Sequence, residues 1–223
     1  MNKIGTFEDF KHFAKANVGV NEEKIKNFAY PTIVEERTAA MRAVEMNVFS
    51  RLIQDRIIFL SGEVNADSMD TIVAQLLYLD SIDGRDINLY INSPGGSCYS
   101  GLELISVMDF VKSDISTTVL GMAASMAAVI ASNGVKGKRY MLPYSRFMIH
   151  QPSSYEGQQK FTDSKIALKE MESVRNDLYE ILSRNSNIPF DKIVQMCENG
   201  DYFMKSDEAI AHGFIDNVIG KKS

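Results

Sequence analysis

The alternation of strands and helices that sets the architecture of this chain is plainest in residues 87–135, INLYINSPGGSCYSGLELISVMDFVKSDISTTVLGMAASMAAVIASNGV. The apolar run at 87–91 is typical of a buried strand, and a turn cluster at 92–96 ends it. Apolar positions then recur at helical spacing over 102–111, and a β-branched run at 115–120 predicts the next strand. Strands that alternate with helices in this way indicate a layered α/β architecture.

The same pattern continues on both sides of this stretch. Toward the N-terminus, apolar positions at helical spacing predict a helix over 35–56, followed by a buried strand at 57–60 and a helix over 72–79. Toward the C-terminus, the expected elements are a small-residue helix over 123–132, short strands at 139–141 and 147–149, and a long charged helix over 162–183.

Length and composition describe one globular domain. With 223 residues and a mass of 25.0 kDa, the chain is long enough for a single well-packed domain, and two domains are not expected. Hydrophobic residues make up 45% and charged residues 24%, which excludes disorder as a description of the whole chain. Because 29 acidic residues outnumber 24 basic ones, a surface that binds the phosphates of nucleic acid is not expected.

The cysteines, the histidines and the hydropathy pattern indicate whether the chain binds metal, spans a membrane or is exported. Cys98 and Cys197 do not form a C-x-x-C pair and the three histidines are scattered, so we expect no metal site and no cofactor. The 21 residues at 115–135 carry no charge, but their serines, threonines and glycines fit a buried strand and helix better than a membrane span. The N-terminus lacks the apolar core of a signal peptide. We therefore expect a cytoplasmic protein with reduced thiols and no membrane contact.

The histidines restrict where nucleophilic catalysis could occur. A Ser/His or Cys/His mechanism would have to use His12, His150 or His212. His12 lies in the N-terminal appendage, and His212 precedes Gly213 at a position typical of a helix C-terminus. His150 instead follows the strand at 147–149, at a strand-to-loop edge where α/β proteins tend to place their sites, so it is the favoured candidate.

Ser125 is the matching candidate nucleophile, because it follows a strand and begins a helix whose amides favour negative charge. Taken alone, however, Ser125 is better explained as a serine that allows close packing in a small-residue helix. The paired glycines of the turn at 92–96 could bring backbone N–H groups to an oxyanion, although taken alone they are better explained as an ordinary Pro-Gly turn. Spacing does not select a carboxylate to orient His150, since triad members meet only in space.

Five blocks of sequence, taken in order, resemble the signature motifs of the proteolytic subunits of Clp protease, a family of serine peptidases. The blocks are YINSPGG at 90–96, GMAASM at 121–126, GKR at 137–139, MIHQP at 148–152, and DYFM at 201–204 with Glu208-Ala209. The resemblance extends from residue 41 to residue 219. Five ordered matches are far more specific than any one motif.

The resemblance implies roles for individual residues. It implies Ser125 as the nucleophile, His150 as the general base and Asp201 as the carboxylate that orients the imidazole. It also implies that the backbone N–H groups of Gly96 and Met126 form the oxyanion hole. Without the resemblance, Asp201 would be read as a solvated loop acid.

The resemblance further implies a crotonase-like α/β fold with repeated β-β-α units and a protruding handle that contains a helix. Its expected divisions are an N-terminal axial extension at 1–34 and a peptidase domain at 35–223, with the handle at 151–186. Family members form two stacked seven-subunit rings, and they cleave unfolded polypeptides that an ATPase unfoldase ring supplies. This chain has no phosphate-binding loop of its own, so the partner would consume the ATP.

Other functions remain open on the sequence alone. A crotonase-type acyl-CoA enzyme shares the fold and the paired backbone amides, but it would use carboxylates in place of a Ser/His pair. A non-catalytic ring subunit is the second alternative, which the intact Ser125, His150 and Asp201 disfavour. Gly200 stands where family members usually carry an arginine that bridges the rings, and this departure raises a third alternative, a ring mixed with a paralogue.

Overall fold

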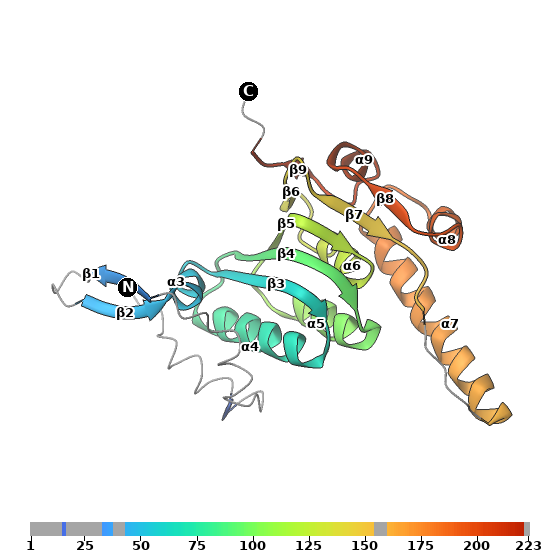
Figure 1. The fold of residues 1–223 in the computed structure, drawn as a ribbon, viewed down its shortest axis with the longest axis horizontal. Helices are drawn as coiled ribbons and strands as arrows, with labels where there is room; N and C mark the ends of the chain where they lie inside the picture. The colour runs from blue at the N-terminus through green and yellow to red at the C-terminus, as the bar shows by residue number, and fades with distance from the viewer. Residues whose placement is uncertain (1–14, 17–32, 38–42, 154–159, 221–223) are drawn as a thin grey trace.

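The computed structural model describes residues 15–16, 33–37, 43–153 and 160–220. Their main sheet has seven strands in the order β3-β4-β5-β6-β9, with β7 paired to β5 and β8 paired to β7 (Figure 1). The strands are β3 (Ile57–Val64), β4 (Ile87–Gly96), β5 (Ile115–Ala124), β6 (Arg139–Met141), β7 (Arg146–Ile149), β8 (Tyr202–Met204) and β9 (Asn217–Val218). The β7–β8 pair is antiparallel and the other pairs of this sheet are parallel.

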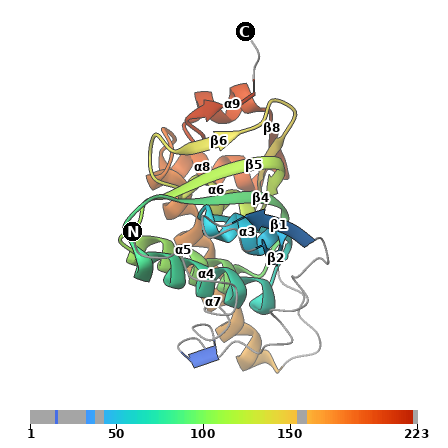
Figure 2. The ribbon, with the colours of Figure 1, turned by 90° about the vertical axis from the view of Figure 1, so that its left-hand side faces the viewer.

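Helices form a layer against one face of this sheet (Figures 1 and 2). Helix α4 contacts β3, α6 contacts β4 and β5, and α4, α5, α6 and α7 contact one another in that order. The helices are α3 (Val48–Gln54), α4 (Ala66–Ile82), α5 (Cys98–Phe110), α6 (Met126–Ser132), α7 (Phe161–Arg184), α8 (Phe190–Glu198) and α9 (Ser206–Ala211). The predicted α/β layering is therefore confirmed, and α7 extends away from the body of the domain (Figure 1).

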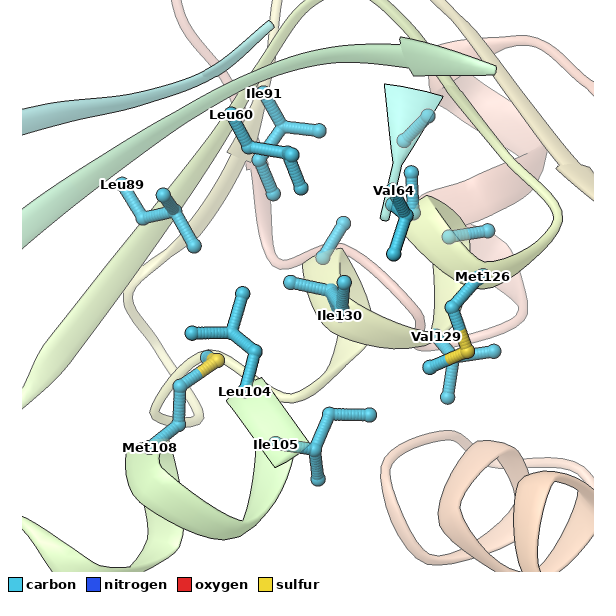
Figure 3. Close-up of a cluster of buried hydrophobic side chains, with 14 of the residues drawn as sticks. Leu60, Val64, Leu89, Ile91, Leu104, Ile105, Met108, Met126, Val129 and Ile130 are labelled. Atoms are coloured by element: carbon cyan, nitrogen blue, oxygen red, sulfur yellow. The ribbon is translucent and has the colours of Figure 1, made fainter. Parts of the chain in front are cut away.

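The core lies between the sheet and helices α5 and α6. Figure 3 shows side chains from β3 and β4 facing those from both helices across a closed apolar layer. Its labelled members are Leu60, Val64, Leu89, Ile91, Leu104, Ile105, Met108, Met126, Val129 and Ile130. The uncharged stretch at 115–135 divides into β5 and α6 within this core, and none of the described helices is long and apolar enough to cross a membrane.

The prediction of a helix over 35–56 is wrong for the first half of that range. Residues Ile33–Arg37 form β1 and Ala43–Asn47 form β2, an antiparallel pair in which Ile33 lies opposite Asn47. The helix α3 begins only at Val48. Residues 44–47, VEMN, alternate apolar and polar residues as a strand does, while Val44 also fits the helical spacing of the residues that follow. The pairing with β1 resolved this ambiguity, and the periodicity of one segment does not contain that information.

One helix begins earlier than expected, and the predicted N-terminal extension and handle fall only partly on described residues. Helix α5 begins at Cys98, four residues before the expected start, because the Ser97 side chain accepts a hydrogen bond from the Ser100 N–H and caps the helix at the turn. The N-terminal segment at 1–34 lies, except for 15–16 and 33–34, outside the described residues, as does part of the segment expected to form the handle.

A buried ion pair fastens the C-terminal segment to β6. The Arg139 guanidinium lies 2.6 Å from Asp216 Oδ1 and donates from Nε to Oδ2 at 2.9 Å. It also donates to the carbonyls of Ser132 and Asn185, at the ends of α6 and α7. Only 3% of the Arg139 side chain and 15% of the Asp216 side chain are exposed. One side chain therefore joins β6, two helix ends and the last strand.

Removing this arginine should be costly. We expect Arg139→Met to lower the free energy of unfolding by about 3–5 kcal/mol, because the Asp216 carboxylate would remain buried without its partner. The matched control is Arg85→Met, which removes an arginine from an Asp83 pair whose side chains are 60% and 35% exposed; because solvent screens this pair, we expect a much smaller loss. Urea unfolding at one fixed protein concentration measures both, and equal losses would contradict the role of Arg139.

The contribution of the Arg139–Asp216 pair to stability depends on pH. Burial alone would raise the pKa of Asp216, but hydrogen bonds from the Arg139 side chain and backbone, together with one from the Gly137 N–H, lower this pKa below its usual value. The contribution to stability is therefore complete above the unfolded-state pKa of about 3.9 and is lost as pH falls through the lower folded-state value. The difference between the wild type and Arg139→Met should shrink over that acid range.

Candidate active site

Ser125 occupies a strained turn between β5 and α6. Its backbone has φ 55° and ψ −128°, a left-handed conformation that is uncommon for a residue other than glycine. The turn is held from both sides, because the Ser125 N–H donates to the Met148 carbonyl at 2.9 Å and the Ser125 carbonyl accepts from the Ala128 N–H at 2.9 Å. Strained residues of this kind cluster at functional sites, where the surrounding structure maintains them.

Strand β7 brings His150 to this turn. β7 pairs in parallel with the end of β5, with Met148 opposite Ala124, so the residue after β7 lies beside the residue after β5. His150 Nε2 lies 2.8 Å from Ser125 Oγ, within hydrogen-bond distance. When the hydroxyl donates to Nε2, the proton of the neutral imidazole is on Nδ1. The structure therefore brings together the two residues selected from the sequence on chemical grounds.

Asp201 reaches the other side of the imidazole. It follows Gly200, whose φ of 116° turns the chain out of α8, and it precedes β8, which pairs with β7 so that Tyr202 lies opposite Ile149. Asp201 Oδ1 lies 3.3 Å from His150 Nδ1, slightly beyond the usual N–H···O distance. The exposed fractions of the two side chains are 58% for Asp201 and 26% for His150. The carboxylate is in position to orient the ring, but solvent screens it.

The glycine turn at the end of β4 lies against Ser125. A Cβ atom on Gly95 would come within 2.7 Å of Ser125 Cβ, and one on Gly96 within 2.2 Å of the Val64 carbonyl oxygen. Both residues also have positive φ, 91° and 148°, so other residue types would be strained here. The Gly95 N–H donates to Ser93 Oγ at 3.1 Å and is therefore already engaged within the turn.

The backbone amides expected at the oxyanion hole lie on the two segments that border Ser125. Gly96 is the last residue of β4. Met126 is the first residue of α6, a position whose N–H has no partner within the helix. Strands β4 and β5 pair at Ser93 and Ala123, which keeps these two segments beside each other.

An apolar pocket opens beside the candidate nucleophile. Its lining comes from α5, the Ser125 turn, α6, the end of β7 and the C-terminal half of α7. The lining residues are Cys98, Ser125, Met126, Val129, Ile149, His150, Pro152, Leu178, Tyr179 and Leu182. Burial raises the pKa of the Cys98 thiol and of the Tyr179 phenol, so both are neutral near pH 7. The pocket suits an uncharged, apolar group next to the reacting atoms.

No pattern in the sequence indicates this pocket directly. The helical periodicity of 162–183 indicates an apolar face of α7, but it does not distinguish residues that face the core from those that face a cavity. Leu178, Tyr179 and Leu182 lie on the buried side of α7 and contribute to the pocket.

The other candidates lie away from the site or outside the described residues. His212 is the C-cap of α9, as its position before Gly213 predicted, and its Nε2 is 3.8 Å from Glu208. His12 lies outside the described residues. Within the ranges that the structure describes, no three His, Cys, Asp or Glu side chains gather in a way that could hold a metal ion.

Comparison with known proteins agrees with the five sequence blocks. The model of the Clp protease family matches residues 40–222. An ATP-dependent Clp protease proteolytic subunit of Bacteroides thetaiotaomicron is 44% identical over 223 residues, covering 96% of this chain and 100% of the relative. A protein of the same name from Porphyromonas gingivalis is 42% identical over 222 residues, with 96% and 98% coverage. The matches include the segments that carry Ser125, His150 and Asp201. This chain therefore belongs to the Clp protease family and has its crotonase-like α/β fold.

Proposed function

We propose that this chain is the proteolytic subunit of an ATP-dependent Clp protease and a serine endopeptidase that hydrolyses peptide bonds of unfolded polypeptides. The observation that carries the proposal is the 2.8 Å approach of Ser125 Oγ to His150 Nε2, with Asp201 on the opposite ring nitrogen. The names of the relatives support the assignment of the protease and of an ATPase partner. Since this sequence has no G-x-x-x-x-G-K-[ST] loop, the ATPase would be a separate ring-forming unfoldase.

The proposed mechanism is acyl transfer in two steps. Ser125 Oγ attacks the carbonyl carbon of the peptide while His150 Nε2 accepts the hydroxyl proton, and Asp201 stabilises the imidazolium. The N–H groups of Gly96 and Met126 hold the oxyanion. His150 then donates its proton to the departing amine. Water, deprotonated by the same ring, attacks the acyl-enzyme and releases the second product.

The assay that tests this proposal uses fluorogenic peptides with an apolar side chain on the acyl side of the cleaved bond. We expect turnover of these peptides and no binding of acyl-CoA. The opposite result, tight binding of acyl-CoA with no peptide turnover, would favour the crotonase-type alternative. A chain that assembles normally but turns over no peptide would favour the non-catalytic ring subunit.

Peptide hydrolysis should slow down at acidic pH. We expect kcat/KM to fall as the solution is acidified, because a protonated His150 cannot accept the Ser125 proton. The measurement is peptide hydrolysis between about pH 5 and about pH 8. A rate that stays constant over this interval, with the fold intact by circular dichroism, would contradict His150 as the base.

We further propose that the chain assembles into two stacked seven-membered rings, with 35–223 as the peptidase domain, 151–186 as the handle and 1–34 as an axial extension. The buried residues of α7 all lie in its C-terminal half, from Val174 onward, whereas Phe161 and Ile166 near its start are 77% and 65% exposed. An apolar helix surface of this kind suits contact with another subunit. Native mass measurement tests the assembly: a fourteen-subunit mass supports it, and a smaller one favours a ring mixed with a paralogue.

The proposed location is the cytoplasm. Cys98 and Cys197 are both free thiols in the structure, as suits a reducing compartment. Exchange of the endogenous chain for a fluorescently tagged copy would locate it directly, and export of the tagged protein would contradict the proposal.

A further inference from the structure

Cys98 has a distinct place in the pocket beside Ser125. It is the one lining residue that α5 contributes, whereas the other lining residues come from the Ser125 turn, α6, the segment around His150 and α7. The Cys98 side chain is half-buried, and it packs against the hydrophobic core. Its thiol therefore lies at the boundary between the core and the space that a substrate side chain would enter.

The backbone holds Cys98 in a fixed position relative to Ser125. The preceding residue, Ser97, donates its N–H to the Val64 carbonyl at 2.8 Å and caps α5 through its side chain. One turn later, Gly101 packs so tightly on Met126 that an added Cβ atom would lie 2.2 Å from Met126 Cγ. Because Met126 directly follows Ser125, the first turn of α5 cannot move away from the site without disturbing α6.

The chemistry of the thiol suits an apolar substrate group. Burial raises the pKa of Cys98, which keeps the thiol protonated and neutral near pH 7. A neutral thiol behaves as a small, polarizable hydrophobic group. A larger side chain at this position would extend into the pocket from the α5 side, and a smaller one would widen it.

We propose that Cys98 is a specificity-determining residue, whose size limits which side chain on the acyl side of the scissile bond the pocket accepts. This inference rests on the proposed peptidase function. It predicts that enlarging residue 98 selectively impairs substrates with large apolar side chains, because a misfit of one methylene in an apolar pocket costs about 10–200-fold in kcat/KM.

The test enlarges Cys98 chemically in the assembled protein. Methyl methanethiosulfonate reacts with a thiolate so that an S–S bond to the methylthio group forms, the S–SO₂ bond breaks, and methanesulfinate leaves; the thiol proton goes to buffer. Cys197 is fully buried, so the modification should occur at Cys98. We expect kcat/KM for phenylalanine substrates to fall at least about 10-fold more than that for alanine substrates, and dithiothreitol to restore it.

Two variants make the test specific. Cys98→Ala should lose sensitivity to the reagent, and Cys98→Met should reproduce the selective loss without any reagent. The inference would be overturned by equal effects on the phenylalanine and alanine substrates. Full modification of Cys98 with no change in the ratio of their kcat/KM values would also overturn it.

A readout that does not require hydrolysis separates this inference from the proposed function. In Ser125→Ala, a peptide ending in phenylalanine should slow the modification of Cys98, as followed by intact mass, and a peptide ending in aspartate should not. Protection without any hydrolysis by the wild type would contradict the peptidase function while supporting the pocket assignment. Equal rates of modification with both peptides would overturn the pocket assignment.

Discussion

Ser125→Ala should abolish peptide hydrolysis, with kcat reduced by about 10⁵–10⁶, the size of loss seen when a serine peptidase loses its nucleophile. The Ser125 hydroxyl lies 2.8 Å from His150 Nε2, and it lies next to the glycine turn and to the start of α6. Alanine removes the attacking oxygen while leaving the backbone and the pocket in place. Initial rates with a fluorogenic peptide, measured at high enzyme concentration, give the residual activity.

The matched control for this variant is Ser132→Ala, at the end of the helix that follows Ser125. Ser132 is fully buried, and its hydroxyl donates to the Val129 carbonyl at 2.7 Å, away from His150. This control also removes a serine hydroxyl, and we expect it to keep peptide turnover within a few-fold of the wild type. Comparable turnover by Ser125→Ala and the wild type would show that another residue is the nucleophile.

Asp201→Asn should lower kcat by about 10²–10⁴. In a buried triad, replacing the aspartate by asparagine costs about 10⁴, because the imidazole is then held in the wrong tautomer. Here Asp201 Oδ1 lies 3.3 Å from His150 Nδ1 and the Asp201 side chain is 58% exposed, so solvent shares in stabilising the imidazolium. The structure therefore favours the lower part of this range over the effect of a fully buried carboxylate.

Asp207→Asn is the control for Asp201→Asn. Asp207 is an exposed acid in the first turn of α9, so its replacement changes the net charge equally without touching His150. We expect full activity for Asp207→Asn and unchanged assembly for both variants. If Asp201→Asn were as active as its control, His150 would act without a carboxylate partner and the triad would be reduced to a dyad.

The sequence predicts an element well when the pattern that indicates it lies within that element, and poorly when the element depends on pairing or packing with another segment. The strands and helices from 57 to 132 could be predicted because each has its own apolar periodicity, but β4 continues to Gly96 and β5 to Ala124, beyond the ends expected at 91 and 120. Residues 35–47 were assigned to a helix because apolar spacing alone does not reveal that β1 and β2 pair across a turn. Helix α8 was not predicted, and of α9 only the C-terminal end was indicated, by His212; both helices are short, and a short helix depends on packing more than on its own periodicity.

The same distinction holds for the residues of the candidate active site. Ser125 and His150 could be selected from the residues themselves, since His150 follows a predicted strand and Ser125 lies at the start of the helix predicted after another strand. Asp201 came only from the resemblance to the Clp protease family, because it reaches His150 through the antiparallel pairing of β8 with β7. The pocket required the packing of α7 against α6, which no single segment encodes.

The most direct test of the central claim is labelling of the native assembly with a fluorophosphonate, followed by peptide mapping. Phosphonylation of a serine requires an activated hydroxyl, since the oxygen displaces fluoride as the neighbouring base accepts the proton. The account predicts one adduct per chain, located on Ser125, that disappears when the protein is unfolded before labelling. An adduct on a different residue, or continued peptide turnover by protein that has no adduct after prolonged treatment, would contradict it.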